Sequence, residues 1–566
     1  MLKTTKLLSA IVLLVTALLF NACSDSPVVE AGAANDVSTS IPADASGVFL
    51  MNVKSMMEKA DYPAFQKTEV FAEFLKEVEK ETPSLVPFVK DPASAGIDLE
   101  GNMGMYFKAD KEIKNSSFAM LMPVADVEKA KAAVEVLLKE AKEANKEGDE
   151  EITTTEKEGY TLHAFGDEFY IVQSDRILAF TSFGDDAQVK ALVAPEGNGI
   201  RDNAKYAEQV ATDKDMVYWL DIDPLVEAAF NDSKVKMRTE AALAAASIPA
   251  EGLKNNSMYG FSHFLKGKSE GELSFAFSDE LKKELGDLVA DKMAVSYAGY
   301  LPQGNLGAAF SFGVNGEGVL NFLTKRGLDE GIDQQLGMLG LTLGDVNNGI
   351  TGDLAAGIYP PAAGSSEPAV VIALGLKDKA FMEKLMGMPP LSMFMTKEGE
   401  NYVLDRGADM MGNAKPKFYA KIVDDALVVS NDATLFEQAL GGKTNSNIEP
   451  LQEGWLGMFV DYTVIAENFD VLAGMIPMNP MVLAQVANSV KYQNVTTAYV
   501  VGKGETLELL SNNKDANTNA LKSGWMTWNQ MHKDGVLDVK IEDAIEDEME
   551  GFEAEFEEAE EEVEQM

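Results

Sequence analysis

The stretch IPADASGVFLMNV, residues 41–53, opens a folded unit, and LPQGNLGAAFSFG, residues 301–313, repeats its design. In both stretches a turn that contains proline and glycine leads into alternating apolar and small or polar side chains. A short helical pattern follows, at residues 55–59 and 318–325. Alternation with a period of two predicts a half-buried strand. The recurrence of this order roughly 250 residues later predicts a second copy of one structural unit.

Later segments correspond in the same order, as an internal repeat requires. The matching pairs are residues 101–107 with 352–359, 118–124 with 370–376, 159–162 with 401–404, 169–182 with 418–430, 217–223 with 456–462 and 271–277 with 505–511. Helical patterns follow the second pair at residues 126–139 and 378–386. The sequence therefore predicts an α+β protein of two tandem, duplicated domains, residues 41–290 and 291–535. Each is expected to be a mainly antiparallel sheet with helices on one face. Because identity between the copies is low, chance similarity of strand patterns is the alternative.

The N-terminus has the pattern of a lipoprotein signal peptide over residues 1–22. Lys3 and Lys6 precede an uncharged apolar run, residues 7–20, which is too short to span a bilayer as a helix. The run ends at LFNAC, which resembles a lipobox and predicts diacylation of Cys23, although Phe20 and Asn21 depart from its commonest form. An ordinary cleaved signal peptide is the alternative. Residues 23–40 are then a lipidated cysteine and a flexible tether.

Two consequences follow from Cys23. It is the single cysteine of the chain, so an internal disulfide and a cysteine-based zinc site are excluded. Two acyl chains hold a protein stably on a membrane. By resemblance to well-studied envelopes, Ser24 in place of aspartate favours the outer membrane, with the face of that membrane left open.

The net charge of −43 restricts the partners. So acidic a surface repels phosphate backbones and anionic headgroups, which argues against nucleic-acid binding and assigns membrane attachment to the acyl anchor. A basic protein surface, a neutral glycan or an apolar ligand fits this charge. The alternative is that the charge only keeps the protein soluble.

The lipobox, the short tether, the IPADA opening and the strand–helix units that follow resemble a family of Bacteroidota lipoproteins classed only as a domain of unknown function, of the type numbered 4836. The resemblance spans most of the chain, and it implies no catalytic or binding residues.

Residues 536–566 form an acidic tail. Its last 26 residues, 541–566, contain fourteen carboxylates and no basic side chain. Apolar side chains recur there at heptad spacing: Ile545, Met549, Phe552, Phe556, Ala559, Val563 and Met566. This stripe predicts an amphipathic helix that forms when docked on an apolar groove rimmed by basic residues, because its carboxylates repel one another in water. A solubilising tail is the alternative interpretation.

The residues needed for familiar catalytic chemistry are sparse. His163, His263 and His532 lie far apart in the sequence, without a metal-binding spacing, and no nucleophile motif has a fitting context. We therefore expect no enzyme activity, no metal and no cofactor. Methionine-rich segments at residues 386–395 and 475–481 suit core packing or apolar binding. Whether these segments or Trp525 and Trp528 form a binding surface is left open.

The sequence thus favours a non-enzymatic, outer-membrane-anchored binding or scaffold protein of the cell envelope. Its possible partner-docking residues are Ile545, Met549, Phe552, Phe556 and Val563. The alternative is a lipoprotein that captures an apolar or glycan ligand between its two domains.

Overall fold

The structure is a computed structural model. It describes residues 36–536 except 145–151, 168, 211–212, 232–235, 238–249, 286–287, 294–298, 362–364, 366, 390–391, 393–394, 406, 408–416, 444 and 470–489.

Ten strands make up the first half of the fold. They are β1 (Gly47–Asn52), β2 (Asn102–Lys108), β3 (Ser117–Pro123), β4 (Ile152–Lys157), β5 (Tyr160–Phe165), β6 (Phe169–Ser174), β7 (Ile177–Thr181), β8 (Met216–Asp221), β9 (Ser257–Leu265) and β10 (Lys268–Ala276). Their order in the sheet is β4-β5-β6-β7-β3-β2-β1-β8-β9-β10, and each neighbouring pair is antiparallel.

Ten further strands make up the second half. They are β11 (Ala308–Gly313), β12 (Ile350–Tyr359), β13 (Ala369–Leu376), β14 (Met395–Glu398), β15 (Asn401–Leu404), β16 (Phe418–Val423), β17 (Ala426–Ser430), β18 (Leu456–Asp461), β19 (Val495–Lys503) and β20 (Thr506–Asn513). Their order is β14-β15-β16-β17-β13-β12-β11-β18-β19-β20, the same relative order as in the first half. An internal duplication would produce this agreement, and duplication stays our interpretation of it.

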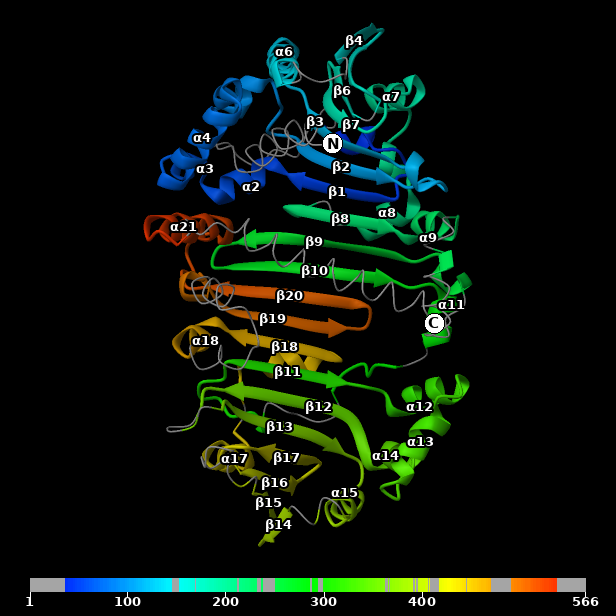
Figure 1. Ribbon diagram of the computed structural model, residues 1–566, viewed down its shortest axis with the longest axis vertical. Coiled ribbons are helices and arrows are strands. Elements are labelled where there is room, and N and C mark those ends of the chain that lie inside the picture. The colour runs from blue at the N-terminus through cyan, green and yellow to red at the C-terminus, as the bar shows by residue number, and fades with distance from the viewer. Residues whose placement is uncertain are drawn as a thin grey trace, which may run out of the picture.

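The two halves share one sheet. The last strand of each half, β10 and β20, pair antiparallel from Lys268 opposite Asn512 to Ser274 opposite Thr506. Twenty strands therefore follow one another along the long axis of the molecule (Figure 1). The sequence predicted two separate sheets. The two sheets join because each half ends in an edge strand, and unpaired main-chain groups of two edge strands satisfy each other.

Helices cover both faces of the first-half sheet, and not the one face that the sequence predicted. One face carries α2 (Val53–Ala60), α3 (Tyr62–Phe65), α4 (Glu69–Glu81), α5 (Val86–Lys90) and α6 (Val127–Ala144), with the short helices η2 (Pro83–Leu85) and η3 (Pro92–Ala95). The other face carries η1 (Val37–Ser40), α7 (Asp186–Val193), η5 (Gly199–Asp202) and α8 (Ala204–Gln209). Successive strand residues point to opposite faces, so Met51 belongs to the first core and Leu50 to the second. The α+β class itself is confirmed.

The first helix after each opening strand begins in the same way. The Asn52 side chain accepts a hydrogen bond from the Ser55 amide at the start of α2, at 2.9 Å. The Asn315 side chain accepts one from the Gly318 amide, at 3.2 Å, at the start of α12 (Gly316–Lys325). Asn is a favoured N-cap because it satisfies an amide that has no partner inside the helix. The shared caps put α2 and α12 in register with each other.

Helices also lie on both faces of the second-half sheet. The connection between β11 and β12 holds α12, α13 (Asp329–Gly337) and α14 (Leu343–Gly349), and α15 (Lys379–Met386) lies beside them. On the opposite face lie α17 (Ala433–Leu440) and η8 (Glu449–Glu453). The remaining helices are η4 (Ile113–Asn115), α9 (Ile222–Asn231), η6 (Ala250–Leu253), α11 (Asp279–Leu285) and α18 (Tyr462–Glu467).

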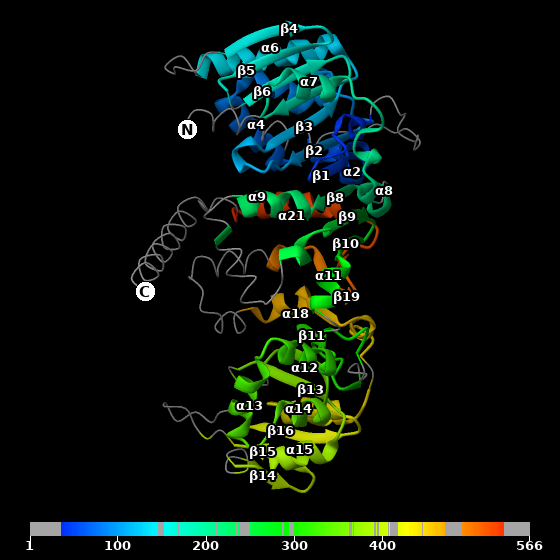
Figure 2. The ribbon, with the colours of Figure 1, turned by 90° about the vertical axis from the view of Figure 1, so that its right-hand side faces the viewer.

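The last described helix, α21 (Ala520–Lys533), follows the second half in the chain but packs on the first half. It lies against α2 and α4, as both views show (Figures 1 and 2). Lys522 forms an ion pair with Asp61, and His532 Nε2 lies 2.9 Å from Glu73 Oε2. The boundary expected near residue 290 therefore does not separate two self-contained packing units.

The folded part begins earlier than predicted. Val37, Ser38 and Ser40 of η1 are buried, whereas the sequence assigned residues 23–40 to a tether. The Asp36 carboxylate caps η1 through the Ser38 amide, at 2.9 Å, and pairs with Arg201. The chain is thus fixed to η5 from Asp36 onward.

Candidate functional site

Seven neighbouring strands present an apolar surface that contains no polar side chain over two rows. Residues directly opposite in an antiparallel sheet lie on the same face. From β10 through β20, β19, β18, β11 and β12 to β13, one row is Gly271, Leu509, Val500, Met458, Phe310, Ala356 and Ile372; the next is Leu273, Leu507, Gly502, Leu456, Phe312, Leu354 and Leu374. We call these fourteen positions the uncharged face.

Three large side chains of the uncharged face are exposed, ten of its positions are half-buried and Gly502 is buried. Phe310, Met458 and Leu509 are 39%, 44% and 42% exposed, and Ile358, one row further, is 44% exposed. The helices α9, α11, α18 and α21 lie toward the ends of the strands in this part of the sheet (Figure 1), and η8 packs on the opposite face. The opposite face differs: Ala309, Phe459 and Val501 are buried there in the second-half core. Large apolar side chains that are exposed in neighbouring strands make this face a candidate interaction surface.

Acidic side chains of the central strands lie on the opposite face. Glu272 of β10 stands directly opposite Glu508 of β20, and Lys503 Nζ lies 2.9 Å from Glu508 Oε2. Because side chains alternate between faces, Leu273 and Leu509 next to them point to the uncharged face. The sheet therefore separates charge from apolar surface at the junction of the halves.

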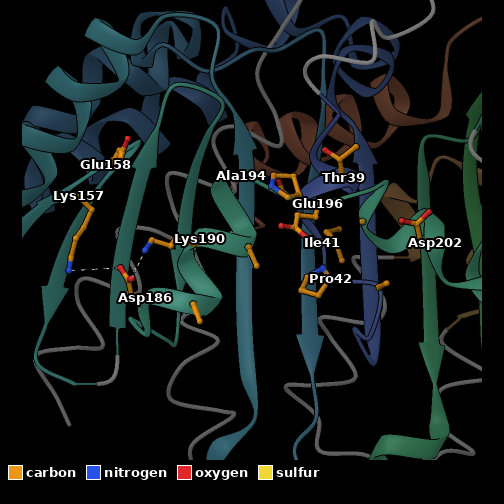
Figure 3. A pocket seen from close by; sticks show the side chains of 16 residues that line it. Thr39, Ile41, Pro42, Lys157, Glu158, Asp186, Lys190, Ala194, Glu196 and Asp202 are labelled. Carbon is orange, nitrogen blue, oxygen red and sulfur yellow. Dashed lines mark ion pairs between the residues drawn. The ribbon is translucent and has the colours of Figure 1, made fainter.

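A second feature is a groove of about 710 Å³ beside α7, shown in Figure 3. Its walls are the opening segment (Thr39 to Ala43), the turn between β4 and β5, α7 and the loop after α7. Alanine and proline side chains from the opening segment and α7 give it an apolar part. Its charged part consists of two lysines and four carboxylates: Lys157, Lys190, Glu158, Asp186, Glu196 and Asp202.

Asp186 lies between the two lysines of the groove. Its carboxylate lies 2.8 Å from Lys190 Nζ and 3.9 Å from Lys157 Nζ, and it accepts a hydrogen bond from the Tyr160 hydroxyl. The hydrogen bonds from Lys190 and Tyr160 lower the pKa of Asp186. Burial, followed by the bond to Asp186, raises the pKa of Tyr160 to about 12. Asp186 is thus held ionised, and with Glu158, Glu196 and Asp202 it gives the groove four carboxylates against two lysines.

A third feature is a buried ion cluster around Asp215, which is 1% exposed. Lys59 Nζ lies 2.6 and 2.7 Å from its two oxygens, the Ser55 hydroxyl donates at 2.6 Å, and the Phe264 amide donates at 2.6 Å. His263 Nδ1 lies 3.2 Å from Asp215 Oδ2. The carboxylate already accepts several donors, so the cluster attaches α2 to β9 and offers no free acid or base.

The second half has no such cluster at the equivalent positions. Trp455, the residue before β18, stands at the position of Asp215, the residue before β8. Phe322 lies seven residues after the cap Asn315, as Lys59 lies seven residues after the cap Asn52, so Phe322 stands at the position of Lys59. The repeated unit therefore forms with apolar side chains where the first half has charges.

The structure places some of the sequence-selected residues and leaves others out. Cys23 and the tail residues Ile545, Met549, Phe552, Phe556 and Val563 lie outside the described residues, as do Met393, Met475, Met478 and Met481. Met386, the last residue of α15, is buried in the cluster between α15 and the second-half sheet. Trp525 packs against Phe65 and donates to the Ala60 carbonyl, whereas Trp528 is 48% exposed, so the two indoles do not share one surface.

The three histidines lie apart, in β5, β9 and α21. Within the described part of the chain, no three His, Cys, Asp or Glu side chains come close enough to hold a metal ion. No described helix has both the length and the apolar composition that a membrane span requires.

Sequence reasoning missed the uncharged face. The signal was present, because LGAAFSFG at residues 306–313 and TTAYVVG at residues 496–502 are apolar or small at nearly every position. Such strands are normally buried on both faces. The sequence alone does not show that one of the two faces stays open.

The sheet, its two helical layers and its uncharged face define an α+β protein with exposed apolar side chains on one face of the sheet. The chain belongs to the family described as "Domain of unknown function (DUF4836)", whose model matches residues 38–436. No curated protein matches the chain significantly.

Two solved structures are similar over part of the chain. One is titled "Structure of crystal form III of TP0453", with 8% identity, a TM-score of 0.24 and coverage of 44% of this chain and 87% of that one. The other is titled "Structure of crystal form I of TP0453", with 9% identity, a TM-score of 0.22 and coverage of 43% and 78%.

Proposed function

We propose that this protein is a non-enzymatic binding or scaffold lipoprotein of the cell envelope, anchored to the outer membrane through Cys23. In this proposal the uncharged face binds another envelope protein. The observation that carries the proposal is the open row Phe310, Met458 and Leu509 in a chain of net charge −43.

The length of the tether limits the distance between the anchor and the folded part. Thirteen residue steps separate Cys23 from Asp36, where the described chain begins. A fully extended chain covers at most about 3.5 Å per residue, so the anchor lies within about 45 Å of η1. Two acyl chains supply stable attachment, and the acidic surface keeps the folded part off anionic headgroups.

Burial of the uncharged face would be favourable. Each Å² of apolar surface removed from water contributes about 25 cal/mol, so a partner that covers a few hundred Å² here gains several kcal/mol before its entropy costs. A membrane is a poorer partner, since the carboxylates of the surrounding protein would approach the headgroups. A protein with an apolar patch and a basic or neutral rim fits best.

The acidic tail is a separate docking element in this proposal. Its stripe, Ile545 to Val563, needs a groove rimmed by cations, and the fourteen positions of the uncharged face contain none. The tail therefore binds an apolar groove with a basic rim, and the uncharged face binds a different surface.

A photo-crosslinking residue at Met458 tests the proposal in intact cells. Glu508 on the opposite face is the matched control position, because it belongs to the same part of the sheet and is also exposed. We expect a discrete crosslinked protein from position 458 and none from 508. Equal products from both positions, or none from 458, contradict the proposal. Truncation after Leu537 then shows whether the same partner also needs the tail.

Ligand capture is the second candidate function, favoured by the groove beside α7. All residues that line the groove lie between Thr39 and Asp202, so the groove belongs to the first half and does not lie between the two halves. Its apolar wall suits an apolar molecule or a neutral glycan, because four carboxylates against two lysines disfavour an anionic ligand. Native mass spectrometry of protein extracted from membranes would show such a ligand as added mass, and Ala191→Trp, which fills part of the groove, would remove that mass.

A further inference from the structure

The first half contains a helix-binding site that the chain itself fills. The helix α21 crosses α2 and α4, with the Trp525 indole next to Phe65 at a centroid distance of 5.6 Å. A cation lies toward each end: Lys522 pairs with Asp61, and Lys533 Nζ lies 3.9 Å from Glu69 Oε1. The helix α21 thus presents an aromatic side chain in its middle and a cation near each end, and the surface that binds it is apolar in the middle and acidic at the ends.

Several apolar side chains of α2 to α4 are buried in the first-half core, whereas the other side chains of these helices are half-buried or exposed. Met57, Phe65 and Phe71 are all at most 5% exposed. Residues 53–81 contain seven acidic and five basic side chains, a net charge of −2. The site therefore combines apolar packing with a modest excess of negative charge.

The equivalent layer of the second half is open. The principal helix contacts of α12 and α13 are with each other and with α14, all within the β11–β12 connection. Neither α12 nor α13 contains a buried residue. Leu328, Met338 and Leu339 are 48%, 83% and 42% exposed. Residues 316–349 contain five acidic and two basic side chains, a net charge of −3.

We infer that α12 and α13 form a docking site for an amphipathic helix of another protein, with a large apolar side chain at its centre and Lys or Arg near its ends. This inference depends on the proposed binding function and specifies the partner's recognition element. The shared Asn caps and the equal strand order place α12 where α2 lies, and the apolar and acidic character of the two layers agrees. The acidic tail of this chain is not the occupant, because residues 541–566 have no cation to offer.

A peptide of residues 519–535 is the probe, since α21 already shows the required chemistry. The full chain is titrated against the labelled peptide and binding is followed by fluorescence anisotropy. We expect saturable one-to-one binding, weakened at least tenfold by Met338→Glu with Leu339→Glu. Met237→Glu is the control variant, because Met237 is 68% exposed and belongs to the first half. A peptide with Lys522→Glu and Lys533→Glu should not bind.

Three results would overturn the inference. The first is that the peptide shows no saturable binding. The second is that the double variant Met338→Glu with Leu339→Glu binds the peptide as well as the unchanged protein does. The third is that Asp61→Lys abolishes binding while the double variant still binds. The last result would show that the peptide exchanges with α21 on the first half. If a photo-crosslinker at Met458 captures a protein but the peptide does not bind, the proposed binding function holds. The inference that the partner is recognised through a helix is then wrong.

Discussion

The indole of Trp525 packs against the ring of Phe65, with centroids 5.6 Å apart, although 460 residues separate them in the chain. The helix at the end of the second half is thereby part of the first-half core. Together with the β10–β20 pair it makes the two halves one folding unit, even though each has its own complete set of ten strands.

Loss of the Trp525 side chain should destabilise the whole protein. Trp525→Ala removes a partly buried ring from the first-half core and its hydrogen bond to Ala60, and we expect a loss of about 2–3 kcal/mol in the free energy of unfolding. Trp528→Ala, on the exposed side of α21, should change it by less than about 0.5 kcal/mol. Urea titrations followed by circular dichroism measure both. Equal effects would show that α21 is not docked as described.

The turn at Gly267 should be sensitive to a single methyl group. Gly267 has φ +73°, and a Cβ there would lie 2.6 Å from Ala516 Cα, in the loop after β20. Gly159, in the turn between β4 and β5, has φ +86° and open space around it. Both alanine variants carry backbone strain of about 1 kcal/mol, and Gly267→Ala adds a clash of about 1–3 kcal/mol. Urea midpoints that coincide for the two variants would contradict the tight junction.

Removal of the buried carboxylate should be costly. Asp215→Asn leaves Lys59 without its partner in a buried cluster, and the expected loss of stability is about 3 kcal/mol. Glu100→Gln removes the exposed partner of Lys54 and should have no measurable effect. Paired urea titrations at pH 7 compare them. A small effect of Asp215→Asn would mean that the cluster does not fix α2 to β9.

His163 should make the fold sensitive to acid. Burial, and then the charge of Lys142, lower the pKa of His163 below its usual value of 6.5. As the pH falls, the unfolded chain therefore protonates this histidine at a higher pH than the folded chain does. The contribution of neutral His163 to stability is present above about pH 6.5 and decreases as the pH drops toward the lower pKa of the folded state. His163→Gln should reduce this loss between pH 7 and 5. Unfolding free energies with the same pH slope in both proteins would count against the effect.

The sequence predicted the local elements well and their assembly less well. Strand alternation at residues 41–53 and 301–313 depends on neighbouring residues, and the structure has a strand in each stretch. The pairing of β10 with β20 and the docking of α21 depend on contacts hundreds of residues apart, for which periodicity gives no signal. The open uncharged face is likewise a property of the assembly, because the same apolar strands would suit a buried sheet.

The most direct test of the binding role is thiol accessibility at position 458. Cys23 is the single natural cysteine, and acylation would block its thiol, so Met458→Cys and Glu508→Cys each introduce one reactive group. A membrane-impermeant maleimide is applied to opened membranes and to the detergent-purified protein. We predict that the thiol introduced at position 458 is protected in membranes and reacts after purification, while the thiol at position 508 reacts at the same rate in both. Equal reaction at position 458 in both preparations would contradict the claim that the uncharged face binds a partner.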